Sequence, residues 1–295
     1  MAFEHIHPDL RYVAHQSRDE RLAFMDSPRW IGYDKAERAI QELAQLLNKP
    51  KRPRMPNLLL VGEPNNGKTT ILHRFFRNYG QAYTDENNDP VRPVLLAEAP
   101  PSADEKGLYL SILERFWAPH RPTDPTAKLR YQVIHLCRSC HVSMLAIDEF
   151  HSLLAGTAAR QREVMNALKL LCNELAIPIV GAGTLDAVRV LHTDPQHASR
   201  FDVLRLPLWE LDKDFQRLLL GFERILPLQQ QSRLHDPRIA SRIHSISGGN
   251  LGDLHRLLVA CASEAIRTEQ EHITLDILDR NQWIRPTRGI REIEL

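Results

Sequence analysis

The chain has 295 residues, of which 25% are charged and 43% are hydrophobic, which is the composition of an ordinary folded protein. The formal net charge of +1 excludes a strongly basic surface, so any contact with nucleic acid must come from a local patch. The first residues do not resemble a signal peptide, and no apolar run approaches the roughly 20 residues that span a bilayer. We therefore expect a cytoplasmic protein without membrane contact.

Residues 1–29 are mostly polar and charged, with scattered apolar side chains, and we interpret them as an arm that packs on its own chain or on a partner. A helix is expected over residues 35–47, capped by Asp34. Prolines then interrupt regular structure over residues 49–56. This linker carries four cationic side chains: Lys49, Lys51, Arg52 and Arg54. They form either a solvated loop or a contact to an anionic partner.

Residues 62–69 fit the pattern G-x-x-x-x-G-K-[ST], the phosphate-binding loop of nucleotide hydrolases. The loop follows a short apolar run at 57–61, typical of a buried strand, and precedes a helical pattern at 70–76. Glycines at both ends let backbone N–H groups point at phosphate oxygens, and the helix N-terminus adds partial positive charge. Nucleotide binding is thus assigned to Gly62, Glu63, Pro64, Asn65, Asn66, Gly67, Lys68, Thr69 and Thr70.

Four side chains have expected roles in nucleotide hydrolysis: Lys68, Thr69, Asp148 and Glu149. Lys68 would reach the β- and γ-phosphates, and the Thr69 hydroxyl would bind Mg²⁺. A strand is expected at 93–98, followed by a helix from residue 108 and a helix at 126–141. A second buried-strand pattern then ends at Asp148 and Glu149. Because ligands of parallel sheets bind beyond the carboxyl ends of the strands, Asp148 can hold Mg²⁺ through water and Glu149 can polarise the attacking water.

The cysteines do not form a recognisable disulfide framework. Cys137 and Cys140 make a single C-x-x-C pair within the helix expected at 126–141. Without a second pair at metal-binding spacing, we interpret both as packing residues, with a metal or redox role as the alternative.

The remaining patterns define the fold class. Strands at 177–181 and 202–206 alternate with helices at 153–174 and 186–191, which predicts an α/β domain: a five-stranded parallel sheet between helices. From Trp209 onward only helical patterns occur, the last at 273–283, which predicts a small all-helical domain. The expected organisation is an N-terminal arm (1–29), an α/β nucleotide-binding domain (30–207), a helical domain (208–284) and a C-terminal tail (285–295).

Taken together, the motifs resemble the AAA+ ATPases over about residues 30–280, with the small helical domain in the place of their lid. Four stretches look more narrowly like TniB, a family of bacterial transposition ATPases related to TnsC: residues 30–33, 145–151, 181–184 and 199–201. The resemblance implies ATP and Mg²⁺ as cofactors.

The resemblance also assigns roles to single residues. Thr184 would be the polar sensor between the phosphate loop and the Asp-Glu strand, and Arg200 the arginine finger that reaches the γ-phosphate bound by the next subunit. Ile31 would wall the adenine. One position departs from the family pattern: where the lid often carries an arginine, this chain has Gly252, with Arg256 one turn later. This departure puts lid sensing through an arginine in doubt.

Members of such families assemble as rings or helical filaments on double-stranded DNA and hand target DNA to a DDE transposase. The resemblance therefore implies a homo-oligomer with DNA, a transposase and a target-selection protein as partners. Lys106, Lys128 and Arg130 lie in segments that can face the central channel in similar ATPases, and they are the expected DNA contacts.

Two other functions fit the same motifs. One is a helicase-loader-like AAA+ ATPase that acts on replication proteins. The other is a nucleotide-gated signalling switch with slow turnover, against which the lack of a large sensor or repeat domain argues.

Overall fold

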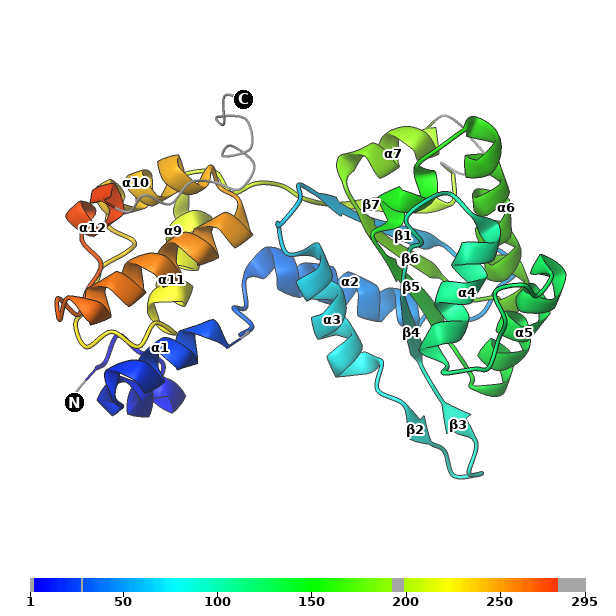
Figure 1. Ribbon diagram of the computed structural model, residues 1–295, viewed down its shortest axis with the longest axis horizontal. Helices are drawn as coiled ribbons and strands as arrows, with labels where there is room; N and C mark the ends of the chain where they lie inside the picture. Colours follow the sequence, from blue (N-terminus) through cyan, green and yellow to red (C-terminus); the bar gives the residue numbers. More distant parts are fainter. Residues whose placement is uncertain (1–2, 28, 193–198, 281–295) are drawn as a thin grey trace. The chain divides into compact units, whose positions relative to one another are not determined.

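The chain forms two compact units (Figure 1). We call residues 35–207 the sheet unit, and residues 1–34 together with 208–295 the helical unit. The computed structural model describes residues 3–27, 29–192 and 199–280. The tail expected at 285–295 lies outside these ranges.

The sheet unit alternates strands with helices along the chain. Its strands are β1 (Asn57–Gly62), β2 (Tyr83–Thr84), β3 (Pro90–Val91), β4 (Val94–Glu98), β5 (Met144–Asp148), β6 (Ile179–Gly183) and β7 (Phe201–Leu206). Its helices are α2 (Asp34–Leu47), α3 (Lys68–Tyr79), α4 (Glu105–Arg115), α5 (Thr126–Ser139), the 3-10 helix η2 (Phe150–Leu154), α6 (Ala158–Leu175) and α7 (Leu185–His192).

The main sheet has five strands in the order β4-β5-β6-β1-β7, and every neighbouring pair is parallel. This arrangement confirms the predicted fold class. Figure 1 shows α4, α5 and α6 on one side of this sheet and α3 on the other. Because helices cover both faces, the interior strand β1 is buried along its whole length. Its Leu59 and Val61 join the core formed with α4, α5 and α6, and the alternate residues face α3.

Helix α3 begins at Lys68, two residues before the helical pattern expected at 70–76, so the phosphate loop runs directly into the helix. The polar stretch after α3 includes a short antiparallel hairpin of β2 and β3. The side chain of Asp85 closes its tip by accepting hydrogen bonds from the N–H groups of Asn87 and Asp89, each at 2.9 Å. Such a two-residue strand is too short for alternation to reveal it in the sequence.

The helix expected at 153–174 is instead two elements, η2 and α6, and the segment between them contains Gly156 and Thr157. Gly156 has φ +103°, which an L side chain rarely adopts, and it therefore ends the first element. Thr157 then begins the second, because its Oγ1 accepts a hydrogen bond from the N–H of Arg160 at 3.4 Å.

The helical unit contains the 3-10 helix η1 (Pro8–His15), α1 (Arg18–Asp26), α9 (Lys213–Glu223), α10 (Pro237–Ser247), α11 (Leu251–Arg267) and α12 (Leu275–Arg280). Asp212, Asp236 and Asn250 cap the starts of α9, α10 and α11. Part of the last helix expected, at 273–283, extends beyond the described residues. Within the described ranges, no helix combines the length and apolar character needed to cross a membrane.

The turn between α10 and α11 requires glycine. Gly248 and Gly249 have φ +59° and +72°. The carbonyl oxygen of Gly249 accepts a hydrogen bond from the N–H of Trp209 at 2.8 Å, and a Cβ on Gly249 would lie only 2.1 Å from the Trp209 carbonyl oxygen. Because Gly249 has no side chain, the segment around Trp209 can pack directly against this turn, where Trp209 is buried.

The N-terminal segment is built into the helical unit. Arg21, which is 4% exposed, donates hydrogen bonds from Nε (2.9 Å) and Nη2 (2.7 Å) to the carbonyl oxygen of Pro227, and it forms an ion pair with Glu271. The Gln229 side chain donates to the carbonyl oxygen of Ala14 at 3.0 Å. Residues expected to form an arm therefore pack on their own chain.

Removal of the Arg21 side chain should loosen this attachment. Arg21→Ala leaves the Glu271 carboxylate without its buried partner, and we expect a loss of about 3–5 kcal/mol in local stability. Hydrogen exchange of the α1 and α11 amides measures the loss. Arg18→Ala, an exposed position on the same helix, is the control. Equal protection in both variants would contradict the role of the ion pair.

Candidate nucleotide-hydrolysis site

The phosphate loop connects β1 to α3 through a turn that needs positive φ angles. Asn65 has φ +60° and Gly67 has φ +85°. The amide of the buried Asn66 anchors the loop, because its Nδ2 donates to the carbonyl oxygens of Leu206 at 3.0 Å and Pro207 at 3.2 Å. The end of β7 thus holds the loop in shape, with the first N–H groups of α3 at its far end.

Lys68 lies inside this loop. Its Nζ donates hydrogen bonds to the carbonyl oxygens of Gly62 at 3.0 Å and Glu63 at 2.8 Å. Burial lowers the pKa of the ammonium group, whereas the negative charges of Glu149, Asp148 and Glu63 act in the opposite direction. The phosphate loop and the Asp-Glu strand, distant in sequence, therefore form one electrostatic site.

The two carboxylates stand at the carboxyl end of β5. Asp148 pairs with Glu98 of β4 and is half-buried, and its Oδ1 accepts a hydrogen bond from the N–H of Glu149 at 2.9 Å. Glu149 has φ +53°, so the chain turns sharply there. Oxygen ligands such as the Asp148 carboxylate and the Thr69 hydroxyl are those that Mg²⁺ prefers, and the residues present fit that ion.

His151 is a further polar side chain at this edge that the sequence did not single out for a role. Its Nδ1 lies 3.4 Å from Oε2 of Glu149, and among the described residues this buried nitrogen has no hydrogen-bond partner. A histidine two residues after Glu149 carries no recognisable sequence signal. Only the structure, in which the chain turns at Glu149, shows that the histidine lies beside that carboxylate.

Thr184 follows β6, and the strand order places β6 between β5 and β1. This position lies between the strand of Asp148 and the strand that leads into the phosphate loop. The two glycines before Thr184 allow η2 to approach β6 closely. A Cβ on Gly181 would lie 2.7 Å from the Phe150 ring, and one on Gly183 would lie 3.1 Å from the backbone nitrogen of His151.

Arg200 lies at the opposite end of the sheet from the phosphate loop. Its carbonyl oxygen accepts a hydrogen bond from the N–H of Asn57, the first residue of β1, at 2.9 Å, whereas Gly62 ends that strand. The five intervening rises correspond to about 16 Å along a strand. The structure therefore does not bring Arg200 together with Lys68 and Glu149 of the same chain.

Ile31, the expected adenine contact, and Arg256, for which the departure from the family pattern leaves no assigned role, belong to the helical unit. Ile31 packs against the buried cluster of that unit, and a Cβ on Gly221 would lie 3.4 Å from its Cγ2. Arg256 is exposed on α11, with Gly252 in the first turn of that helix.

The candidate DNA contacts lie on the helix pair α4 and α5, which pack together. Lys106 is in the first turn of α4. Lys128 is exposed and forms an ion pair with Asp124 at 2.9 Å. Burial raises the pKa of Tyr109 on α4, and the positive charge of Arg130 on α5 acts in the opposite direction.

A phosphate loop, a strand ending in Asp-Glu and this strand order are those of the AAA+ ATPases. The fold is similar to that of ORC2 from Aeropyrum pernix in ADPNP-ADP complexes, with a TM-score of 0.60 and 17% identity over 92% of this chain and 74% of that chain. Cdc6p from Pyrobaculum aerophilum has a TM-score of 0.59 and 18% identity over 85% of this chain and 67% of that chain. ORC1 from A. pernix in complex with DNA has a TM-score of 0.60 and 15% identity over 88% of this chain and 67% of that chain.

The family is identified more narrowly from the sequence. Residues 21–211 match the family model described as Bacterial TniB protein, so the chain belongs to the TniB family. This confirms the resemblance inferred from the motifs. The sequence matches none of the curated proteins.

Lys68→Ala should abolish ATP binding, because the β- and γ-phosphates lose their fixed counter-charge. Arg77→Ala, an exposed change at the far end of the same helix, should leave binding intact. Titration of a fluorescent ATP analogue measures both affinities. Unchanged affinity in Lys68→Ala would contradict the assignment of the loop.

Proposed function

We propose that this ATPase is a DNA-binding regulator of transposition that oligomerises on target DNA and recruits or activates a DDE transposase. The observation that carries the proposal is the match to the TniB family over residues 21–211, a range that contains the phosphate loop, the Asp-Glu strand, Thr184 and Arg200. ATP-dependent assembly then couples nucleotide state to DNA binding, and hydrolysis releases the assembly.

In this proposal the residues at the carboxyl edge of the sheet divide the chemistry. Lys68 exchanges its carbonyl partners for the β- and γ-phosphate oxygens, and Glu149 orients the attacking water and accepts its proton. Thr69 and Asp148 hold Mg²⁺, which when bound neutralises charge on the phosphates. Thr184 contributes a hydroxyl between the two halves of the site. His151, 3.4 Å from Glu149, positions that carboxylate.

Arg200 serves the ATP of a neighbouring subunit. Its place at the end of the sheet opposite its own phosphate loop supports this role, because such a residue reaches a phosphate only when a second copy stacks head to tail. In the same proposal Ile31 contacts the adenine base of the bound ATP. The exposed side chain of Arg256 is the candidate for the lid arginine that Gly252 cannot supply.

DNA binding through Lys106, Lys128 and Arg130 would be weak in a single subunit, since the whole chain has a net charge of only +1. Repetition of the same few contacts along an assembly multiplies them and gives tight binding. The dependence on assembly is what makes DNA binding dependent on ATP.

Glu149→Gln should bind ATP and assemble on duplex DNA while hydrolysis falls about 10²–10⁴-fold, because an amide cannot accept the proton of the attacking water. Electron microscopy of this variant with ATP, with and without duplex DNA, tests the proposed function together with an ATPase assay. Rings or filaments on DNA support it. Small rings without DNA affinity that respond to a replication protein indicate a helicase loader, and a monomer that retains nucleotide indicates a switch.

Lys106→Ala combined with Lys128→Ala should weaken DNA binding of the assembled protein at all sequences alike. Each lost phosphate contact should also lower the slope of log affinity against log salt by about 0.9 per subunit. Salt titrations on duplex DNA measure both quantities, with Lys213→Ala, an exposed lysine of the helical unit, as the control. Wild-type affinity and slope in the double variant would move the DNA surface elsewhere.

A further inference from the structure

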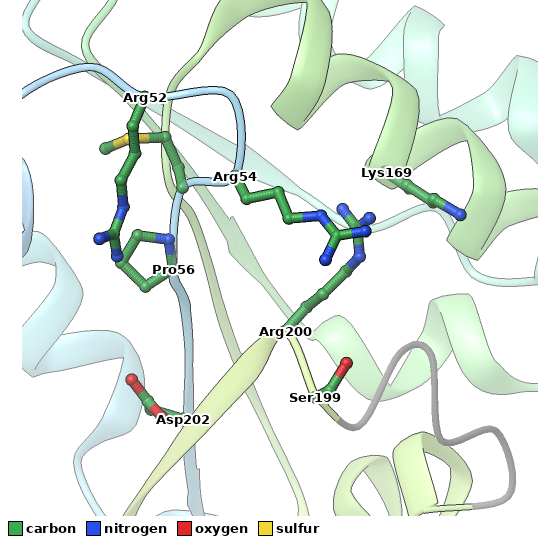
Figure 2. Close-up of a pocket in the computed structure, with 8 residues that line it drawn as sticks. Arg52, Arg54, Pro56, Lys169, Ser199, Arg200 and Asp202 are labelled. Carbon is green, nitrogen blue, oxygen red and sulfur yellow. The ribbon is translucent and has the colours of Figure 1, made fainter.

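A basic cleft of about 580 Å³ lies at the end of the sheet opposite the phosphate loop (Figure 2). The polar side chains that line it are Arg52, Arg54, Lys169, Ser199, Arg200 and Asp202. Four cations thus share one concave surface with a single carboxylate. This concentration of positive charge contrasts with the net charge of +1 for the whole chain.

Three segments that are distant in sequence build the cleft. Arg54 belongs to the proline-rich linker before β1, Lys169 to α6, and Arg200 to the entry into β7. The buried side chain of Asn57 ties these walls together, because its Oδ1 accepts hydrogen bonds from the N–H of Ile179 at 2.9 Å and from Sγ of Cys172, on α6, at 3.6 Å. The N–H of Asn57 in turn donates to the carbonyl oxygen of Arg200. The segments that carry the cations are therefore joined by hydrogen bonds around Asn57.

The four cations of the cleft outnumber the single carboxylate, Asp202, that lines it. Among the described residues, none of the four forms an ion pair, and Nη1 of Arg200 donates only to the neutral Asn173 side chain at 3.4 Å. In Figure 2 the guanidinium groups of Arg54 and Arg200 point to the same part of the cleft. Like charges held close together repel, and an anion between them removes that cost. Guanidinium groups match phosphate oxygens in geometry as well as in charge.

We propose that Arg54 and Lys169 act with Arg200 as a phosphate-binding cluster for the ATP held in the phosphate loop of a second copy of this chain. The inference rests on the proposed function, in which Arg200 alone serves the neighbouring ATP. It adds a second guanidinium from the linker and an ammonium from α6. The linker before β1 thereby becomes part of the ATPase site of the assembly.

Charge complementarity supports a second copy as the partner. The phosphate-loop end of the sheet carries the carboxylates of Glu63, Asp148 and Glu149 together with the triphosphate, and the opposite end carries the cleft. A head-to-tail contact joins these two ends and repeats from subunit to subunit. The alternative anion, a DNA backbone, presents its phosphates along a convex ridge, which fits a small concave cleft with a carboxylate on its wall less well than a compact triphosphate does.

The test measures ATPase activity in the assembled protein. Arg54→Ala should lower the turnover rate per assembled subunit about 10-fold or more, a smaller loss than the ~10³–10⁵ that an arginine finger contributes. ATP affinity of the dissociated subunit should stay at the wild-type value. Arg54→Lys should recover part of the rate because it keeps the charge. Lys51→Ala, an exposed cation of the same linker, is the matched control and should retain the wild-type rate.

A mixing experiment shows whether the cluster acts between subunits. Arg54→Ala subunits bind ATP but lack the cluster, whereas Lys68→Ala subunits keep the cluster but lack the phosphate loop lysine. Mixed assemblies should therefore regain activity above that of either variant alone. Light scattering on the same samples verifies that mixed assemblies form. Wild-type turnover in Arg54→Ala, or no gain in verified mixed assemblies, would overturn the inference.

The remaining outcomes separate this inference from the proposed function. If Arg54→Ala weakens DNA binding while turnover stays normal, the cleft contacts DNA and the inference fails. If Arg200→Ala loses activity and Arg54→Ala does not, the proposed role of Arg200 stands and only the enlarged cluster fails. If wild-type protein neither assembles nor binds DNA with ATP, the proposed function itself fails.

Discussion

Parallel pairing of β1 with β6 and β7 is the constraint on which the rest of the structure depends. Parallel strands all end at the same edge, so the phosphate loop after β1, the carboxylates after β5 and Thr184 after β6 must lie together. The pairing also fixes the shape of the loop, because Asn66 bonds to carbonyl groups at the end of β7. The grouping of these residues at one edge is therefore a consequence of strand order, with β6 between the strand that ends in the carboxylates and the strand that leads to the phosphate loop.

The same pairing gives the sheet unit two chemically different ends. At the carboxyl end of the strands, acidic side chains surround a lysine that is buried among carbonyl oxygens. At the amino end, Arg54 precedes β1 and Arg200 precedes β7, and both side chains line the same cleft. In the proposed assembly, copies stack head to tail so that each subunit completes the site of the next. The proposal thus gives an almost neutral chain its electrostatic contacts through an uneven placement of charge.

The helical unit depends on a different interaction, the burial of Arg21 against Pro227 and Glu271. This ion pair joins α1 to the segment between α11 and α12, far along the chain. Removal of one partner from such a pair costs more than the pair contributes, because a charge remains buried. The N-terminal segment is therefore a structural part of the unit that also contains Ile31, the candidate adenine contact.

The sequence by itself determined the nucleotide chemistry and the fold class. The phosphate loop needs only consecutive residues, and the strand before it, the helix after it and the Asp-Glu strand each carry a local hydrophobic pattern. Features that depend on short or irregular backbone escaped it: the β2–β3 hairpin, the break at Gly156, and the burial of Arg21, whose partners lie far along the chain. The tertiary structure alone decided that Arg54 in a proline-rich linker shares a cleft with Lys169 and Arg200, and that His151 lies beside Glu149. The cleft follows from strand order, which brings distant segments to one end of the sheet. The position of His151 follows from the left-handed backbone of Glu149, because the direction of the chain after this residue is not specified by a hydrophobic pattern.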